Sequence, residues 1–463
     1  MDVKKLMEKR ELIVVLVLVL IFGIYGFFII KGMHQLPGPI YGGDLYYQKG
    51  CIESIRASFN PLASCSVSGA LPGYFPMYGV FISLISLVTF QPVLQSMFIG
   101  SIIIRVLCMI IFFYLFRKFF SFETSMLLLV LVAFYDANQI FKYTVFARLL
   151  VVPLFFLVFL NFKEKKSVKN GVILGLVWGM LGLSHAVGFI GVTLMVFLYW
   201  LWVYGRDLYA QRATIKQKFK HLLHSDFKYI LLAFAIAFVI FMPYWFKPIF
   251  VHHGATSLHY TEWNGDTPAL ESFGEYVSFS WVLLKSSIFF TGIPTVAEWL
   301  FNLIILGSIF LFIFNKKKQE KFETLKILII IGFIVLYHFL VTMPLFRFNF
   351  VPSHITQFVF FTLMFLLAGY ALEFVVTKFS YVRKATYITP LLLIGVLVIS
   401  VGTVTSYQYY PFALSQQNPI DVSLEQFIRE NTDVNDVILT TNELSFKVAG
   451  LTGRKTMVAR RAQ

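Results

Sequence analysis

Apolar stretches of about 20 residues recur along the whole chain, and this feature constrains its fold most strongly. A helix needs about that length to cross ~30 Å of hydrocarbon, where the backbone must satisfy its own hydrogen bonds. Only 14% of the residues are charged, whereas soluble domains carry about 25%. We therefore predict an all-α polytopic membrane protein. The first apolar run, 12–30, is long and lacks a small-residue cleavage site, so we interpret it as an uncleaved first helix.

The distribution of basic residues accounts for the net charge of +15. Most Lys and Arg lie in short loops on alternate sides of the apolar runs: Lys4–Arg10, Arg117–Lys118, Lys163–Lys169, Arg206–Lys228, Lys316–Lys326 and Lys378–Lys384. The positive-inside rule places such loops in the cytoplasm, where they also suit anionic headgroups of membrane lipids. This predicts a multi-pass protein of the cell membrane, with a cytoplasmic N-terminus and an extracytoplasmic C-terminus. It argues against a nucleic-acid partner.

About eleven spans fit this orientation. They are residues 12–30, 95–116, 122–136, 147–161, 170–184, 186–204, 229–246, 295–314, 325–343, 355–377 and 386–405. The apolar run 74–90 is the exception, because counting it as a crossing would place Arg117 and Lys118 outside. We interpret that run as a re-entrant or interfacial helix.

These spans divide the chain into two predicted domains. Residues 1–408 form a transmembrane domain with two large outer segments, 31–95 with interfacial helices and 247–294. Residues 409–463 are less hydrophobic and begin an extracytoplasmic α/β segment. We expect a helix with Asp421 or Ser423 as its N-cap, followed by strand-like stretches at 436–440 and 451–458.

Two further features of the outer segments leave alternatives open. The α/β segment stops before its core is complete, so we hypothesise that the chain is the N-terminal part of a longer protein. Cys51 and Cys65 both lie in the first outer loop, where oxidation is possible. A disulfide and two free thiols are equally compatible with the sequence.

The first outer loop carries the most informative acidic residue. Two glycines precede Asp44, and a helix-like stretch follows with Ile52, Ile55 and Phe59 on one side. A carboxylate at the membrane surface could act as a general base, or could bind a divalent cation such as Mg²⁺ or Mn²⁺ that holds a lipid phosphate. The alternative is that Asp44 only caps the helix.

Other polar residues lie in or near the predicted spans. Arg105 is near the middle of a span, where arginine usually faces a bundle interior or a wet cavity. Arg148 and Arg347 lie at outer helix ends, where they could bind phosphate or reach lipid headgroups. His185 could line a cavity or be a satisfied polar residue at a helix junction. Asp136 is a candidate second acid and metal ligand.

The chain resembles the GT-C glycosyltransferases in the order of these features. This superfamily includes oligosaccharyltransferase catalytic subunits and protein O-mannosyltransferases. The resemblance rests on a first helix that enters from the cytoplasm, an outer loop with Asp44 after Gly-Gly, and an interfacial helix. Three later motifs, KYTVFARLL at 142–150, GLSH at 182–185 and RF at 347–348, are similar to uncharacterised prokaryotic members, some of them catalogued as 6-pyruvoyl-tetrahydropterin-synthase-related membrane proteins. The resemblance implies a GT-C-like bundle in which Asp44 is the catalytic or metal-binding acid.

The C-terminal segment adds to this resemblance and also departs from it. Residues 423–439 are similar to the segment that opens the outer domain of oligosaccharyltransferases. That family places a Trp-Trp-Asp motif there to read the acceptor, whereas this chain has TTNELS at 440–445. Transfer to asparagine sequons is therefore not implied.

The resemblance implies transfer of a sugar or oligosaccharide from a polyprenyl-phosphate-linked donor to a glycan, protein or lipid acceptor on the outer face. Asp44 would be the base or metal ligand, Arg347 and Arg148 would hold the donor phosphate, and His185 and Arg105 would line the substrate cavity. The alternatives are a transporter or flippase of lipid-linked intermediates, or a non-catalytic scaffold of the same fold. Transporters typically contain internal repeats, and we find none in the sequence.

Overall fold

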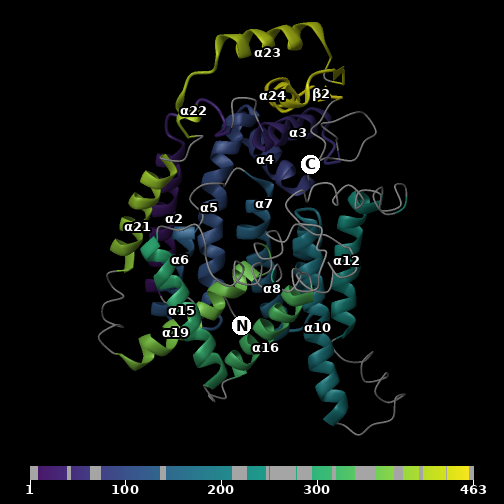
Figure 1. Ribbon diagram of the computed structural model, residues 1–463. Coiled ribbons are helices and arrows are strands. Elements are labelled where there is room, and N and C mark those ends of the chain that lie inside the picture. Colours follow the sequence, from purple (N-terminus) through teal and green to yellow (C-terminus); the bar gives the residue numbers. More distant parts are fainter. Residues whose placement is uncertain are drawn as a thin grey trace. The chain divides into compact units, whose positions relative to one another are not determined.

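The computed structural model describes residues 9–38, 43–62, 75–135, 142–210, 227–246, 250, 278, 295–314, 320–338, 358, 360–379, 389–405, 410–433 and 435–457. In this part of the chain the fold is almost entirely helical (Figure 1). The contacts divide the chain into two compact units. The first consists of Met1–Ile110, Asp136–Phe146 and Leu391–Gln463, and the second of Ile111–Tyr135 and Ala147–Pro390.

A helix lies at each of the eleven predicted spans. In chain order they are α2 (Lys9–Ile30), α5 (Val93–Arg117), α6 (Phe122–Tyr135), α8 (Val152–Glu164), α9 (Val168–Gly182), α10 (Ala186–Ala210), α12 (Phe227–Phe246), α15 (Thr295–Phe314), α16 (Glu320–Tyr337), α19 (Phe361–Lys378) and α21 (Thr389–Thr405). Within the described residues, six helical stretches are long and apolar enough to cross a membrane. These are Ile13–Ile30, Val93–Arg117, Tyr143–Glu164, Ala186–Arg206, Phe227–Phe246 and Phe361–Lys378. The exact number of crossings and their orientation stay predictions.

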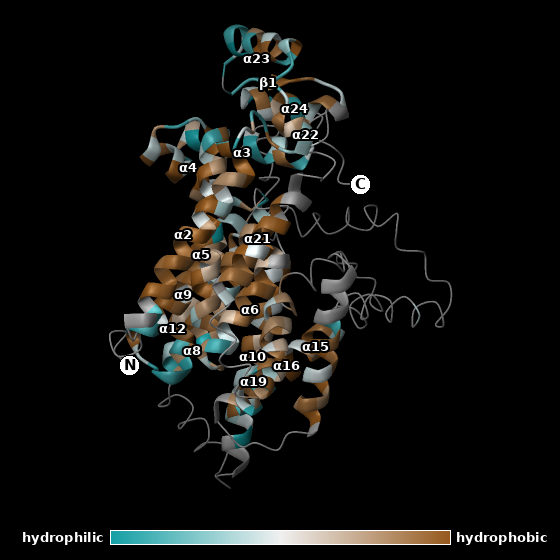
Figure 2. Ribbon diagram, turned by 90° about the vertical axis from the view of Figure 1, so that its left-hand side faces the viewer, coloured by the Kyte–Doolittle hydropathy of each residue, from teal (hydrophilic) through white to brown (hydrophobic). Residues whose placement is uncertain are grey.

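Helix α2 shows why these helices suit a bilayer. Leu18 and Phe22 are buried at 2% and 1% exposure, whereas Leu16, Leu20 and Phe27 on other faces are more than half exposed. Figure 2 shows that hydrophobic residues cover α2 and α5 along most of their length. A helix that is apolar on every face needs an apolar surrounding. Lipid supplies that surrounding for the faces that protein does not cover.

In the first unit, two shorter helices follow α2 in the predicted outer loop. Helix α3 spans Asp44–Ser58, and α4 spans Pro76–Thr89 with proline in its first turn. At about 1.5 Å per residue, the 14 residues of α4 reach less than the ~30 Å of a hydrocarbon core. The predicted spans α6 and α9 are similarly short, with 14 and 15 residues, so the interpretation of 74–90 as a helix that does not cross the membrane stays a prediction.

Helix α3 ends earlier than the sequence predicted. Ile52 and Ile55 are buried at 1% and 7% exposure, but Phe59 is 76% exposed and has a left-handed backbone with φ of 52°. The prediction that Phe59 shares their face is wrong. Asn60 precedes Pro61, and the proline ring disfavours helical backbone at the residue before it, so the helix has already ended at Ser58.

The C-terminal segment of the first unit contains the predicted helix followed by a strand, and it also contains two helices that the sequence did not predict. It contains α22 (Tyr410–Leu414), α23 (Pro419–Asn431), β1 (Val437–Ile438), α24 (Asn442–Thr452) and β2 (Lys455–Thr456). The two strands are parallel, with Val437 opposite Lys455, so β1, α24 and β2 form a β-α-β unit. The prediction of Asp421 or Ser423 as N-cap is wrong. Asn418 caps α23, because its side chain accepts the Ile420 N–H at 3.0 Å.

The second unit holds the closest helix pair of the membrane part, α9 and α12. Four glycines of α9 face α12: Gly171, Gly175, Gly179 and Gly182. A Cβ added to Gly175 would lie 2.6 Å from the Ala233 carbonyl oxygen and 2.8 Å from Ile236 Cβ. Small residues at this spacing allow helix backbones to approach closely in membranes. The pairing of α9 with α12 therefore depends on these glycines.

We predict that Gly175→Leu destabilises the protein by roughly 1–3 kcal/mol, the usual cost of overpacking, because helix backbone cannot yield to the new side chain. The measurement is the thermal unfolding midpoint in detergent. Gly23→Leu in α2 is the matched control, since nothing lies within 4 Å of a Cβ at that position. Equal midpoints for the two variants would contradict this account.

Candidate functional site

Asp44 is the first residue of α3, directly after a glycine with a left-handed backbone. Gly43 occupies the N-cap position with φ of 73°, a conformation that glycine adopts without steric cost. Its carbonyl oxygen accepts the N–H groups of Tyr46 and Tyr47 at 3.1 and 3.2 Å. The alternative that Asp44 is the helix cap is therefore not supported. The Asp44 side chain is 49% exposed.

A second chain segment meets α3 beside Asp44. Lys142 Nζ lies 3.6 Å from Asp44 Oδ2, and the next residue, Tyr143, donates its N–H to Gln48 Oε1 at 3.0 Å. Tyr143 begins the short helix α7 (Tyr143–Phe146). Asp44 and Gln48 are one turn apart, so both lie on one face of α3. Two contacts along that face thus hold residues 142–143 against α3.

Lys142, the partner of Asp44, was not predicted as a site residue from the sequence, where it is only part of the motif at 142–150. Several basic residues, among them Lys31, Lys49 and Lys142, lie in the predicted outer loops. The positive-inside pattern therefore carried no signal that singled out Lys142.

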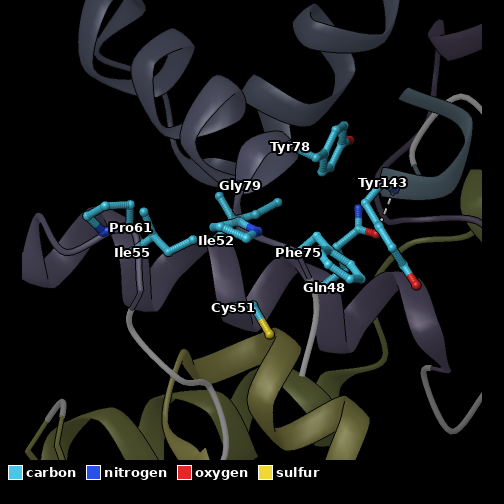
Figure 3. Close-up of a pocket in the computed structure, with 10 residues that line it drawn as sticks. Gln48, Cys51, Ile52, Ile55, Pro61, Phe75, Tyr78, Gly79 and Tyr143 are labelled. Carbon is cyan, nitrogen blue, oxygen red and sulfur yellow. Dashed lines mark hydrogen bonds between the residues drawn. The ribbon is translucent and has the colours of Figure 1, made fainter. Parts of the chain in front are cut away.

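A narrow pocket lies along α3 next to these contacts (Figure 3). Its walls come from α3, from the start of α4 and from Tyr143; the lining residues are Gln48, Cys51, Ile52, Ile55, Pro61, Phe75, Pro76, Tyr78, Gly79 and Tyr143. Gln48 and Tyr143 form its polar end, and the remaining wall is mostly apolar. The space would hold about one water molecule, so it is a cleft for a small group and not a cavity for a whole sugar.

Of the two alternatives for Cys51, a disulfide or a free thiol, the structure has the disulfide. The Cys51 side chain is 8% exposed beside α24. Cys65 lies outside the described residues. Cys108 in α5 is free and buried.

Arg105 lies inside the first unit. It is 7% exposed, and its guanidinium carbon is 4.9 Å from the centre of the Tyr25 ring of α2. The side chain therefore turns toward a neighbouring helix and does not face lipid. A cation over an aromatic ring is stabilised by the ring quadrupole.

Arg148 and His185 approach neighbouring aromatic side chains within the second unit. Arg148 lies in the π-helical turn η1 (Ala147–Val151), with its guanidinium carbon 5.4 Å from the centre of the Phe361 ring. The His185 ring stacks on Phe358 with centres 3.8 Å apart. Phe358 and Phe361 are three residues apart at the N-terminal end of α19. The Arg148 and His185 side chains therefore both lie near that end of the helix. Arg148 and His185 are both buried, at 9% and 4% exposure. The burial of Arg148 argues against the alternative that its side chain reaches the lipid headgroups.

Two predicted site residues, Asp136 and Arg347, lie outside the described residues. The predicted metal site therefore stays untested. Among the residues that the structure describes, no three His, Cys, Asp or Glu side chains gather to hold a metal ion. Asp44 is one carboxylate ligand of the kind that Mg²⁺ or Mn²⁺ prefers, and Asp136 would have to supply another.

Comparison with known proteins places this arrangement in context. No protein-family profile matches the chain. The chain is 38% identical over 136 residues to the uncharacterized protein MJ1080 of Methanocaldococcus jannaschii, a match that covers 28% of this chain and 98% of that protein.

Two solved structures are similar over 96% of this chain, each at 13% sequence identity. One is the archaeal oligosaccharyltransferase AglB from Archaeoglobus fulgidus in complex with an inhibitory peptide and a dolichol-phosphate, with a TM-score of 0.56 and 64% of its length covered. The other is ArnT from Cupriavidus metallidurans bound to undecaprenyl phosphate, with a TM-score of 0.51 and 85% covered. The chain thus spans less than two thirds of the oligosaccharyltransferase. The prediction of a GT-C-like membrane fold is confirmed.

The hydrogen bond between Gln48 and Tyr143 allows a test of the local geometry. We predict that Gln48→Leu speeds amide exchange at residues 142–146 about fivefold, because it removes one partly buried acceptor worth about 1 kcal/mol. Hydrogen–deuterium exchange measures this. Gln426→Leu is the control, since Gln426 bonds only Glu430 on the exposed side of α23 at 2.7 Å. Equal exchange at 142–146 in both variants would contradict the assignment.

Proposed function

Because the chain belongs to the same family as the uncharacterized protein MJ1080 and has the fold of GT-C glycosyltransferases, we propose that it transfers a sugar or oligosaccharide from a polyprenyl-phosphate-linked donor to an acceptor on the outer face of the membrane. The observation that carries this proposal is Asp44, held at the start of α3 and still half exposed. The two solved relatives contain dolichol-phosphate and undecaprenyl phosphate. Both ligands combine a long isoprenoid chain with a phosphate, which supports a donor of this class.

Asp44 is the proposed general base. A base must lie within hydrogen-bond reach of the proton that it removes, and an exposed carboxylate at a helix start meets this requirement. The acceptor hydroxyl or amine would give its proton to Asp44 while its oxygen or nitrogen attacks the sugar carbon. The bond from that carbon to the lipid phosphate would break, and the phosphate would leave with the electron pair. Lys142, 3.6 Å away, fixes the direction of the carboxylate.

Arg148 is the proposed holder of the donor phosphate, together with Arg347. Guanidinium groups present a planar fork of donors that matches phosphate oxygens. The ring of Phe361 supports the Arg148 guanidinium from one side, and His185 and Arg105 are the proposed polar lining for the rest of the donor. In the alternative role, Asp44 would hold a divalent cation together with Asp136, and the cation would neutralise charge on the leaving phosphate.

The decisive experiment compares lipid-linked sugars in a deletion strain and in complemented strains by mass spectrometry. We expect a polyprenyl-linked sugar to accumulate on deletion and to disappear when the wild-type gene is restored. The absence of any such accumulation would refute the proposed function. Identification of the accumulated lipid would also provide the donor for assays in proteoliposomes.

We predict that Asp44→Asn fails to clear the accumulated lipid and transfers sugar about 100-fold more slowly or worse, the usual loss when a general base is removed. The change keeps size and hydrogen bonding, so insertion and the unfolding midpoint should match the wild type. Asp433→Asn is a suitable control, because this exposed residue lies in the C-terminal segment. Wild-type clearance by Asp44→Asn would favour the transporter or scaffold alternative.

Arg148→Lys tests the phosphate assignment. Lysine keeps the positive charge but lacks the planar fork, so we expect the donor KM to rise about tenfold while expression stays normal. Arg206→Lys is the matched control, because Arg206 is exposed and forms a surface ion pair with Glu323 at 3.4 Å. A donor KM equal to that of the wild type in Arg148→Lys would show that only charge is needed there.

A further inference from the structure

The last turn of α24 receives two basic side chains from other helices. The final carbonyl groups of a helix have no partners within the helix. Lys49 of α3 donates to the Gly450 carbonyl oxygen, and Arg429 of α23 donates to the Leu451 carbonyl oxygen at 2.6 Å. Positive charge at a helix C-terminus is also favoured by the helix dipole. Figure 1 shows α24 between α3 and α23, which brings both cations to the same end of α24.

One carboxylate joins these two cations. Lys49 Nζ also donates to Glu53 Oε1, and Arg429 Nη2 lies 3.5 Å from Glu53 Oε2. The Lys49 and Glu53 side chains are only 11% and 16% exposed. Removal of one partner from so buried a pair leaves the other charge uncompensated. The three side chains therefore form one network that connects α3, α23 and α24.

The backbones of α3 and α24 approach as closely as glycine permits. A Cβ on Gly50 would lie 2.5 Å from the Ala449 carbonyl oxygen, and a Cβ on Gly450 would lie 2.7 Å from the Tyr46 carbonyl oxygen. Real side chains do not fit at these distances. The contact is thus reciprocal, with one glycine on each helix.

Further packing surrounds this contact. Tyr47 and Phe446 meet edge to face with ring centres 5.4 Å apart. Gly453 ends α24 with φ of 69°, and a Cβ there would lie 2.6 Å from Glu53 Oε2. Burial raises the pKa of the Tyr46 hydroxyl, and the nearby Asp421 carboxylate adds to the increase. This tyrosine stays neutral and donates its hydroxyl proton to Gln35 Oε1 at 3.3 Å.

We propose that Lys49 and Glu53 are positioning residues: they fasten α3 to the C-terminal α23–β1–α24–β2 segment, and this contact sets the direction of the α3 turn that carries Asp44. Lys49 is five residues from Asp44 on one 15-residue helix. Tilt or fraying of α3 would therefore move the carboxylate. The structural part of this inference is independent of the proposed function, whereas its effect on turnover rests on that function.

The first test is hydrogen–deuterium exchange of the full chain in lipid. Lys49→Met keeps the length of the side chain but removes its charge, and we expect exchange at 44–58 and 442–452 to become at least fivefold faster. Lys49→Arg retains the cation and should stay within about twofold of the wild type. The control is Lys118→Met, which removes the Lys118–Glu164 ion pair of 2.8 Å in the other unit and should leave both segments unchanged.

Gly450→Leu is a second variant that acts by steric exclusion and not by charge. Its side chain would collide with Tyr46 backbone, so it should speed exchange in the same two segments. Far-ultraviolet circular dichroism confirms that each variant still contains its membrane helices. Wild-type exchange at 44–58 in both Lys49→Met and Gly450→Leu would overturn the inference.

The second test separates positioning from mere stability. With the donor identified, Lys49→Met should lower kcat about tenfold while the donor KM stays within twofold, because Lys49 contacts no proposed donor group. Lys49→Arg should restore kcat. Faster exchange at 44–58 with a wild-type kcat would overturn the positioning role. Failure of the proposed function appears separately, as normal lipid clearance by Asp44→Asn, and leaves the exchange result standing.

Discussion

Hydrocarbon offers no hydrogen-bond partners, and this constraint governs where the protein can place its polar chemistry. Each apolar helix satisfies its own backbone groups, and the π-helical turn η1 at the start of one described span is buried. Gly43, which has a left-handed backbone, lies in the loop between α2 and α3. The ion pair between Asp44 and Lys142 lies next to it, at the start of α3. Within the spans, the described cations Arg105 and Arg148 are buried and rest on aromatic rings. Among the described charges of the membrane helices, Arg105 and Arg148 are thus covered by protein, whereas exposed charges such as Arg206 and Glu323 lie near helix ends.

The sequence predicted the membrane helices well because their signal is local. A run of apolar residues determines a span without reference to any other segment, and a helix lies at each of the eleven predicted runs. Helix α3 after Gly43 and strand β1 were predicted in the same way. The strand-like stretch predicted at 451–458 is wrong for 451–452, which end α24, and β2 covers only Lys455–Thr456. The cap of α23 was assigned to Asp421 or Ser423, but Asn418 caps it. Asp421 instead pairs with Lys447 of α24 at 2.7 Å, a contact that no local pattern encodes.

The candidate site was less predictable because its contacts are distant in sequence. The Lys49–Gly450 hydrogen bond joins residues separated by 401 positions. Helix α24 was not predicted, since its glycine, serine and threonine residues have modest helix propensity. Its packing against α3 outweighs that propensity. The start of α3 at Asp44 was predictable, because two glycines before an acid after the first span form a short-range pattern; its role in catalysis stays a prediction.

The two carboxylates of α3 illustrate how one helix can separate stability from reactivity. Glu53 is 16% exposed and is engaged by both Lys49 and Arg429, so little of its carboxylate is open to contact with another molecule. Asp44 is 49% exposed and lies 3.6 Å from one lysine, so another molecule can still approach it, as its proposed role requires. A carboxylate that binds a substrate loses its hydration water when the substrate binds. A structural carboxylate has already lost its hydration water when the protein folds. The buried Lys49–Glu53 pair holds the middle of α3 in place, so the first turn with Asp44 can stay exposed to solvent and still keep its position.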